Sequence, residues 1–290
     1  MQCLSPIILK NKRATLCHTK QVPCGKCAPC LEKKRADWSI RLREELRVSV
    51  SAIFLTLTYS DEYLPFDEKI GIPTLKKSDL QNFMKRLRAN VDYAYPNDDD
   101  FNVTDFIKLK YFACGEYGTK KERPHYHIIL FNLPKELENL VLKSWTLGNV
   151  HFGECNHATI HYTSGYLITK NDPYFSDLQK PFALMSKGLG FAYINRMGNF
   201  HRKNDVSHYT ALGGEKLALP KYIRHKIFDE KQRIVINAKN NRFYQRSQKV
   251  IQDDILSTDD GKKHFFDIVD QRKNQYQLSR EKFLNKSKKL

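Results

Sequence analysis

The sequence predicts an α+β fold in which helices cover an antiparallel sheet. Three observations support this fold class: strand and helix patterns alternate over residues 31–170, one strand is apolar on both faces, and two further strands flank a short loop. The chain has 290 residues, of which 41% are hydrophobic, and this is enough for a substantial core. We expect one domain with extensions, because the sequence shows no internal repeat and no Gly/Ser-rich linker.

The first three elements have the clearest patterns. Residues 31–47 predict a helix with apolar residues on one side, namely Leu31, Trp38, Leu42 and Leu46. Residues 51–60, SAIFLTLTYS, predict a strand in the middle of the sheet, because apolar residues or threonine occupy both faces. Residues 78–88 predict a helix that begins with Ser78 and Gln81 in capping-box spacing and then carries Leu80, Phe83, Met84 and Leu87.

A hairpin opens the second half of the predicted fold. Residues 105–118 and 125–133 alternate as two antiparallel strands joined by a loop. Residues 135–148 then predict a helix, residues 149–154 a short strand, and residues 162–170 an amphipathic helix. This order of strands and helices is typical of ferredoxin-like or RNA-recognition folds. Further along the chain the periodicity is poor.

The charge of the chain favours a polyanionic partner. The formal net charge is +17, and much of it lies in residues 220–250, with nine Lys/Arg against two acids, and residues 261–290, with nine against three. Both segments interleave Tyr and Phe, which suits nucleic acid better than a membrane surface. No apolar run approaches the ~20 residues of a spanning helix, and the start lacks a secretory signal, so we expect a cytoplasmic protein.

Two histidines one residue apart indicate a metal site. In a strand, His125 and His127 project from the same face, so two imidazoles can share one ion. If the hairpin is symmetric about the loop at residues 117–124, Glu116 lies opposite His125 and Cys114 lies opposite His127. A carboxylate suits Mg²⁺ or Mn²⁺ and a thiolate suits Zn²⁺. We favour Glu116 as the third ligand, because a nucleic-acid site needs an ion with open positions.

Two tyrosines four residues apart are candidate nucleophiles. On a helix, Tyr162, Tyr166 and Lys170 form one stripe. A tyrosine attacks phosphorus poorly unless a metal polarises the phosphate and a cation stabilises the phenolate, a part that suits Lys170. The alternative is that both tyrosines only pack their helix on the sheet.

The cysteines are concentrated near the start of the sequence. Five of the seven lie in the first thirty residues, and in a cytoplasmic protein they are thiols or metal ligands and not disulfides. Cys24, Cys27 and Cys30 follow one another at two-residue intervals, and Cys17 is our candidate for a fourth ligand of a structural Zn²⁺. These residues support the alternative of a zinc-stabilised DNA-binding protein without catalysis.

The motifs in their order resemble those of HUH endonucleases, the His-hydrophobic-His nickases of rolling-circle replication, and in particular the replication initiators of gokushovirus-type microviruses. The resemblance covers roughly residues 23–228 and rests on FLTLTYSDEYLP, YFACGEYGTKKERPHYHIILF and YTSGYLITK, supported by PCGKCAPC, FALMSKGLGFAYI and LPKYIRHKIF. One position departs from the family pattern: Thr169 precedes Lys170 where a second lysine is more usual, and Gly165 weakens the expected helix.

The resemblance implies both a mechanism and a division of the chain. It makes His125, His127 and Glu116 the ligands of Mg²⁺ or Mn²⁺, and Tyr162 and Tyr166 the nucleophiles of a site-specific single-strand endonuclease that forms a 5′-phosphotyrosine link and rejoins strands. The expected partners are single-stranded or supercoiled origin DNA and the polymerase and helicase of a bacterial host. A relaxase or transposase of the same chemistry is the nearer alternative.

We expect three parts of the chain. Residues 1–48 form a Cys-rich segment and a first helix packed on the main domain, residues 49–175 form the HUH core, and residues 176–290 form a basic extension.

Overall fold

The computed structural model describes residues 3, 5–10, 19–94, 108–118, 121–166, 178–211, 213–256 and 274. The chain divides into two compact units, one of Trp38–Ala192 and one that joins Met1–Asp37 to Tyr193–Leu290. The division therefore falls within helix α1 (Ala28–Leu46). The three functional parts expected from the sequence stay a prediction.

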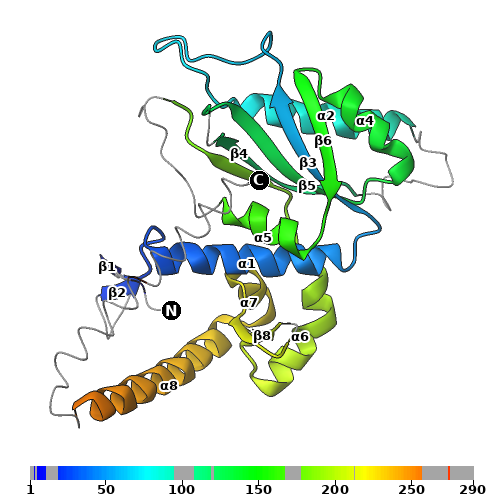
Figure 1. Ribbon diagram of the computed structural model, residues 1–290. Helices are drawn as coiled ribbons and strands as arrows, with labels where there is room; N and C mark the ends of the chain where they lie inside the picture. The colour runs from blue at the N-terminus through cyan, green and yellow to red at the C-terminus, as the bar shows by residue number, and fades with distance from the viewer. Residues whose placement is uncertain are drawn as a thin grey trace. The chain divides into compact units, whose positions relative to one another are not determined.

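The unit Trp38–Ala192 is built on a five-stranded antiparallel sheet (Figure 1). Its strands are β3 (Ala52–Tyr59), β4 (Lys110–Tyr117), β5 (Pro124–Phe131), β6 (Gly148–Glu154) and β7 (Phe182–Met185). The order across the sheet is β6-β3-β5-β4-β7, and every neighbouring pair is antiparallel. The predicted α+β fold with an antiparallel sheet is confirmed, although β5 and not β3 takes the middle position, and β7 was not predicted.

The register of the central hairpin is the one expected from symmetry about its loop. In the β4–β5 pair, Glu116 lies opposite His125 and Cys114 lies opposite His127. Because side chains alternate along a strand, all four of these residues project from one face of the sheet. The intervening Tyr126 points to the other face, where it is fully buried.

Helices cover both faces of this sheet (Figure 1). On the Tyr126 face lie α2 (Lys77–Ala94), the 3-10 helix η1 (Lys135–Leu137) and α4 (Glu138–Ser144). The core of this face includes Leu57, Phe83, Leu87, Ile128 and Trp145. The histidine face is covered by α5 (His157–Gly165) and residues 38–46 of α1, around a smaller core that includes Leu42, Phe112, Ile129 and Ile160. Burial on both faces explains the continuous apolar pattern of β3.

Two predicted helix boundaries are corrected by the structure. Helix α2 begins at Lys77, so Ser78 lies inside its first turn and the predicted capping role of Ser78 is wrong. Helix α5 begins five residues earlier than predicted, because the side chain of Asn156 accepts hydrogen bonds from the backbone N–H groups of Ala158 and Thr159. It ends at Gly165, so Tyr166 is the residue that follows the last helical one.

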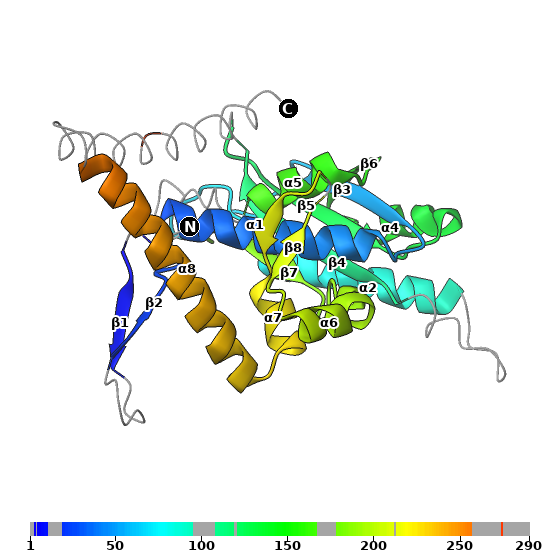
Figure 2. The same cartoon turned by 90° about the horizontal axis from the view of Figure 1, so that it is seen from below.

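The other unit contains a small core that the weak sequence periodicity did not predict. Its elements are β1 (Ile7–Lys10), β2 (Thr19–Val22), α6 (Ala192–Asn204), β8 (His208–Thr210), β9 (Lys216–Ala218), α7 (Lys221–Ile227) and α8 (Glu230–Leu256). The core residues are Tyr193, Leu219, Ile223, Ile227, Phe228 and Ile236. Strands β1 and β2 form a separate two-stranded sheet (Figure 2). Among the described residues, no helix combines the length and apolar character needed to cross a bilayer.

Candidate active site

The hairpin brings two imidazoles to one carboxylate oxygen. The Nε2 atoms of His125 and His127 lie 2.9 and 3.1 Å from Oε1 of Glu116. One ligand atom from each of these residues lies within 4.8 Å of the others, close enough to share one metal ion. Cys114, the other candidate, contacts the backbone oxygen of His127 through its Sγ at 3.7 Å and does not join this group.

Each imidazole is oriented by a second partner on its other ring nitrogen. Nδ1 of His125 lies 3.1 Å from the carbonyl oxygen of Arg123, an arrangement in which Nδ1–H donates and Nε2 keeps its lone pair in a neutral ring. Nδ1 of His127 lies 3.0 Å from Oγ1 of Thr56 on the neighbouring strand β3. Metal-binding histidines in proteins have this kind of outer partner, so the donor set fits a divalent ion.

The site combines an ionised carboxylate with two partly buried imidazoles. Burial alone would raise the pKa of Glu116, but the hydrogen bonds to His125 and His127 outweigh it and lower that pKa below its ordinary value. Burial lowers the pKa of His125, yet the bond to Glu116 more than offsets this and the pKa is raised. Burial keeps the pKa of His127 below its usual range. The charge of this group is therefore suited to a cation.

Both tyrosines contact the ring of His127. Tyr166 stacks on it with ring centroids 5.2 Å apart and an interplanar angle of 8°, whereas Tyr162 meets it edge-on at 5.7 Å. The two phenol rings lie 4.8 Å apart. The structure therefore gathers Tyr162 and Tyr166 beside the group of Glu116, His125 and His127, although α5 contains only the first of the two tyrosines.

The phenols are protonated groups in this environment. Burial raises the pKa of Tyr162 and raises that of Tyr166 further, and the negative charge of Glu116 adds to both effects. The Tyr166 hydroxyl is buried and makes no hydrogen bond within the part of the chain that the structure describes. Lys170, the expected companion cation, lies outside the described residues.

Sequence reasoning missed two residues of this site, Thr56 and Phe54. Thr56 contacts His127 as described above, and the ring of Phe54 stacks on the ring of His127 at 5.4 Å. The available signal was the run FLTLTY, in which Phe54 and Thr56 share a face, but only the strand pairing shows that this face is the one that carries His127.

A second group of possible metal ligands lies in the other unit. The Sγ atoms of Cys3, Cys24, Cys27 and Cys30 all lie within 4.8 Å of one another. Three of them are the cysteines predicted from their spacing, but the fourth is Cys3, which the sequence reasoning missed. Cys17, predicted in that place, lies outside the described residues.

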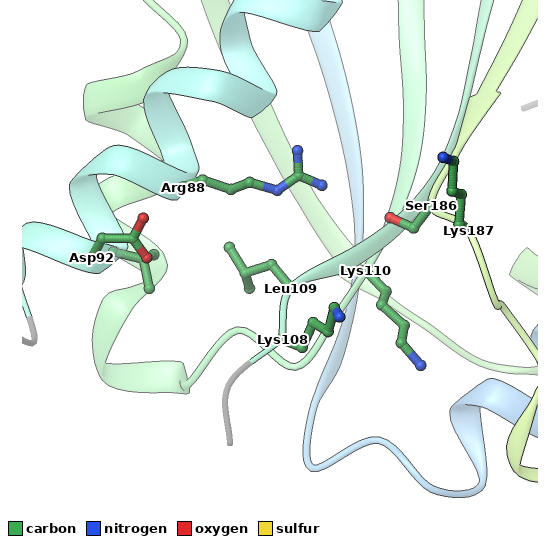
Figure 3. A pocket seen from close by; sticks show the side chains of 8 residues that line it. Arg88, Asp92, Lys108, Leu109, Lys110, Ser186 and Lys187 are labelled. Atoms are coloured by element: carbon green, nitrogen blue, oxygen red, sulfur yellow. The ribbon is translucent and has the colours of Figure 1, made fainter. Parts of the chain in front are cut away.

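The unit that carries the histidines also has a basic cavity of about 470 Å³. The residues that line it are Arg88, Val91, Asp92, Lys108, Leu109, Lys110, Ser186 and Lys187. Figure 3 shows Arg88 extending from α2 on one side, with Ser186 and Lys187 on the other. Lys110 is paired with Glu45, but Lys108 and Lys187 join Arg88 to leave an excess of positive charge. Lys110 and Glu116 are six residues apart on β4, which is roughly 20 Å.

Fold and site together define an α+β protein whose sheet face places a candidate metal centre beside two tyrosines. Comparison with known proteins gives the family. Residues 52–172 match the family model of the replication-associated protein ORF2. The replication-associated protein ORF2 of Spiroplasma virus 4 is 31% identical over 73% of this chain and 69% of its own length. The chain belongs to this family of phage replication-associated proteins, and the microvirus-type replication initiator expected from the motifs is confirmed.

Two further relatives extend the family. The replication-associated protein VP4 of Bdellovibrio phage phiMH2K is 32% identical over 51% of this chain and 48% of its own length. The replication-associated protein ORF4 of Chlamydia phage 1 is 27% identical over 70% of this chain and 52% of its own length. The chain thus spans about half the length of these two relatives.

Proposed function

We propose that this chain is a rolling-circle replication initiator of the HUH type, which cuts single-stranded or unwound origin DNA and keeps the 5′ end on a tyrosine. The observation that carries the proposal is the convergence of two imidazoles, one carboxylate and two phenols on a single sheet face. Phosphoryl transfer to tyrosine requires this combination, because a phenol is a weak nucleophile without a nearby cation.

Glu116, His125 and His127 would hold Mg²⁺ or Mn²⁺ at this face. When bound, the ion would neutralise charge on the non-bridging oxygens of the scissile phosphate. The carbonyl oxygen of Arg123 and the hydroxyl of Thr56 fix the two imidazole rings, so the Nε2 atoms are directed to the ion before DNA arrives.

The tyrosines supply the nucleophile. The phenol oxygen forms a bond to phosphorus, the bond from phosphorus to the 3′ oxygen breaks, and the proton that the phenol loses is balanced by one gained at the 3′ oxygen. The products are a 5′-phosphotyrosine and a 3′-hydroxyl, which primes a host polymerase. Because both rings contact His127, Tyr162 and Tyr166 are each placed to act, one to open the strand and the other to close it.

Positively charged surfaces support DNA as the substrate. The basic cavity described above lies in the same unit as the histidine group, and helices α7 and α8 carry most of the basic residues of segment 220–250. The segment 261–290, apart from residue 274, lies outside the described residues and enters the proposal through its charge alone. Contacts of this kind give affinity for the DNA backbone without reading its sequence.

The direct test is cleavage of circular single-stranded DNA that contains the phage origin, with Mn²⁺ or Mg²⁺, resolved on a denaturing gel. We expect a covalent adduct of protein and DNA that disappears with chelator. Full DNA binding without any cleavage in either metal would instead favour the non-catalytic DNA-binding alternative. Cleavage without a covalent adduct would exclude the tyrosine mechanism.

A further inference from the structure

We propose that Cys3, Cys24, Cys27 and Cys30 form a structural Zn²⁺ site that clamps the β1–β2 hairpin to the first turn of α1. This site is separate from the histidine group and does not depend on the proposed nuclease activity. Its fourth ligand is Cys3, and the intervening Cys17 is not a ligand.

The sulfur geometry matches a tetrahedral thiolate site. Four thiolates around one zinc, at the usual Zn–S distance of ~2.3 Å, lie about 3.8 Å apart. The Sγ atoms of Cys3 and Cys27 are 3.8 Å apart, and all four sulfurs lie within 4.8 Å of one another. None of the four forms a disulfide, which would require a sulfur separation near ~2.05 Å. Thiolates in this number favour zinc over Mg²⁺ or Mn²⁺.

Backbone groups around the cysteines are arranged for thiolate ligands. The N–H groups of Lys26 and Cys27 donate to Sγ of Cys24 at 3.4 and 3.3 Å, and the N–H of Cys24 donates to Sγ of Cys3 at 3.2 Å. The turn that allows this needs Gly25, whose φ of +74° lies in the left-handed region. Cys30 lies in the first turn of α1, where the helix dipole favours negative charge.

The local charge also fits. Four thiolates and one Zn²⁺ carry a formal net charge of about −2. Residues 3–30 contain five Lys/Arg and no Asp or Glu, and one of these, Lys26, lies in the CGKC turn between Cys24 and Cys27. The positive segment therefore offsets the charge of the site.

The hairpin needs such a clamp because it has no core of its own. All four residues of β1 are exposed, including Ile7, Ile8 and Leu9 at 49, 62 and 50%. A two-stranded hairpin of this size is marginal in water. Cys3 precedes β1 and Cys24 follows β2, so one ion joins both ends of the hairpin, and Cys27 and Cys30 tie it to α1. Metal binding then supplies the folding free energy that the side chains do not.

The test counts zinc in the full chain carrying His125→Ala and His127→Ala, so that only the cysteine site is measured. Protein prepared in a reducing buffer without chelator should contain one zinc per chain by elemental mass spectrometry. Cobalt substitution should give the absorption of a tetrahedral cobalt thiolate. A chain that carries no zinc and takes up none, or that carries iron instead, would overturn the assignment.

A matched pair of variants identifies the fourth ligand. In this background Cys3→Ser should weaken zinc binding at least about tenfold in competition with a chromophoric chelator, whereas Cys17→Ser should leave it unchanged. The reverse result would contradict the role of Cys3. Hydrogen exchange gives a second measurement that does not need the variants: removing zinc should speed exchange in peptides from residues 5–22 and leave β5 peptides unaffected, and equal exchange with and without zinc would refute the clamp.

Discussion

Tyr166 stacks on the metal-directed ring of His127, with ring centroids 5.2 Å apart and planes within 8°. The contact joins the residue after α5 to the middle strand of the sheet, and it places a phenol beside the group of Glu116, His125 and His127. Tyr162 meets the same imidazole edge-on. One histidine therefore relates both candidate nucleophiles to the candidate metal centre.

Loss of a metal ligand should abolish cleavage but not DNA binding. We expect Glu116→Gln and His127→Ala to lower the cleavage rate at least about 100-fold, because the charge of the scissile phosphate is no longer offset. Affinity for single-stranded DNA should change by less than about threefold, since basic residues elsewhere supply most of it. His157→Ala, at the exposed first position of α5, is the control and should cleave normally. Normal cleavage by His127→Ala would show that the metal assignment is wrong.

Thr56 should act as a positioning residue for His127. Thr56→Val removes the hydroxyl that lies 3.0 Å from Nδ1, and we expect the Mn²⁺ concentration for half-maximal cleavage to rise about 10- to 100-fold. Thr56→Ser should restore it, because the hydroxyl returns. Thr58→Val is the matched control on the same strand, since the Thr58 hydroxyl donates to the Asn149 carbonyl and not to a histidine. An equal response of both valine variants to Mn²⁺ would point to general damage.

The turn between β7 and α6 should tolerate one glycine substitution far better than another. Gly188 and Gly190 have φ of +78° and +76°, but only at Gly190 would a Cβ meet backbone, at 3.0 Å from Arg41. We expect Gly188→Ala to cost about 1–2 kcal/mol from the left-handed conformation alone. Gly190→Ala should cost at least ~2 kcal/mol more, because the N–H of Gly190 also donates to buried Glu45. Urea denaturation midpoints would measure the difference, and equal values would contradict it.

The basic cavity should contribute to the salt dependence of DNA binding. If Arg88 and Lys187 each contact one phosphate, the double change to alanine should reduce the slope of log affinity against log salt by about 1.4 for single-stranded DNA. Lys143→Ala on the exposed surface of α4 removes one charge as a control and should leave the slope unchanged. A slope unaltered by the double change would place DNA elsewhere.

The sequence predicted the central hairpin better than it predicted the surrounding elements. The pairing of Glu116 with His125 followed from the short loop and the alternation of two strands, which are local features. Thr56 escaped notice because its contact with His127 depends on a pairing between residues 71 positions apart. Strand β7 is four residues long and half-buried throughout, so it has no alternation to read.

The cysteine site shows the same limit. Cys17 was preferred because it is nearer in sequence to Cys24, but the antiparallel pairing of β1 with β2 returns Cys3 to the cluster. The end of α5 was also misplaced. Its pattern of Tyr162, Tyr166 and Lys170 suggested a continuing helix, whereas the described helix stops at Gly165, where glycine is a poor helix former.

The most direct test of the central claim is peptide mapping of the DNA adduct in single and double tyrosine variants. We expect a 5′-phosphate linked to Tyr162 or Tyr166 in the wild type, some single cleavage by Tyr162→Phe and by Tyr166→Phe, and none by the double variant. Only the unmodified pair should ligate unit-length circles over repeated rounds. Tyr93→Phe, on the exposed surface of α2, is the control. A link at neither tyrosine, or cleavage that survives the double change, would contradict the tyrosine mechanism.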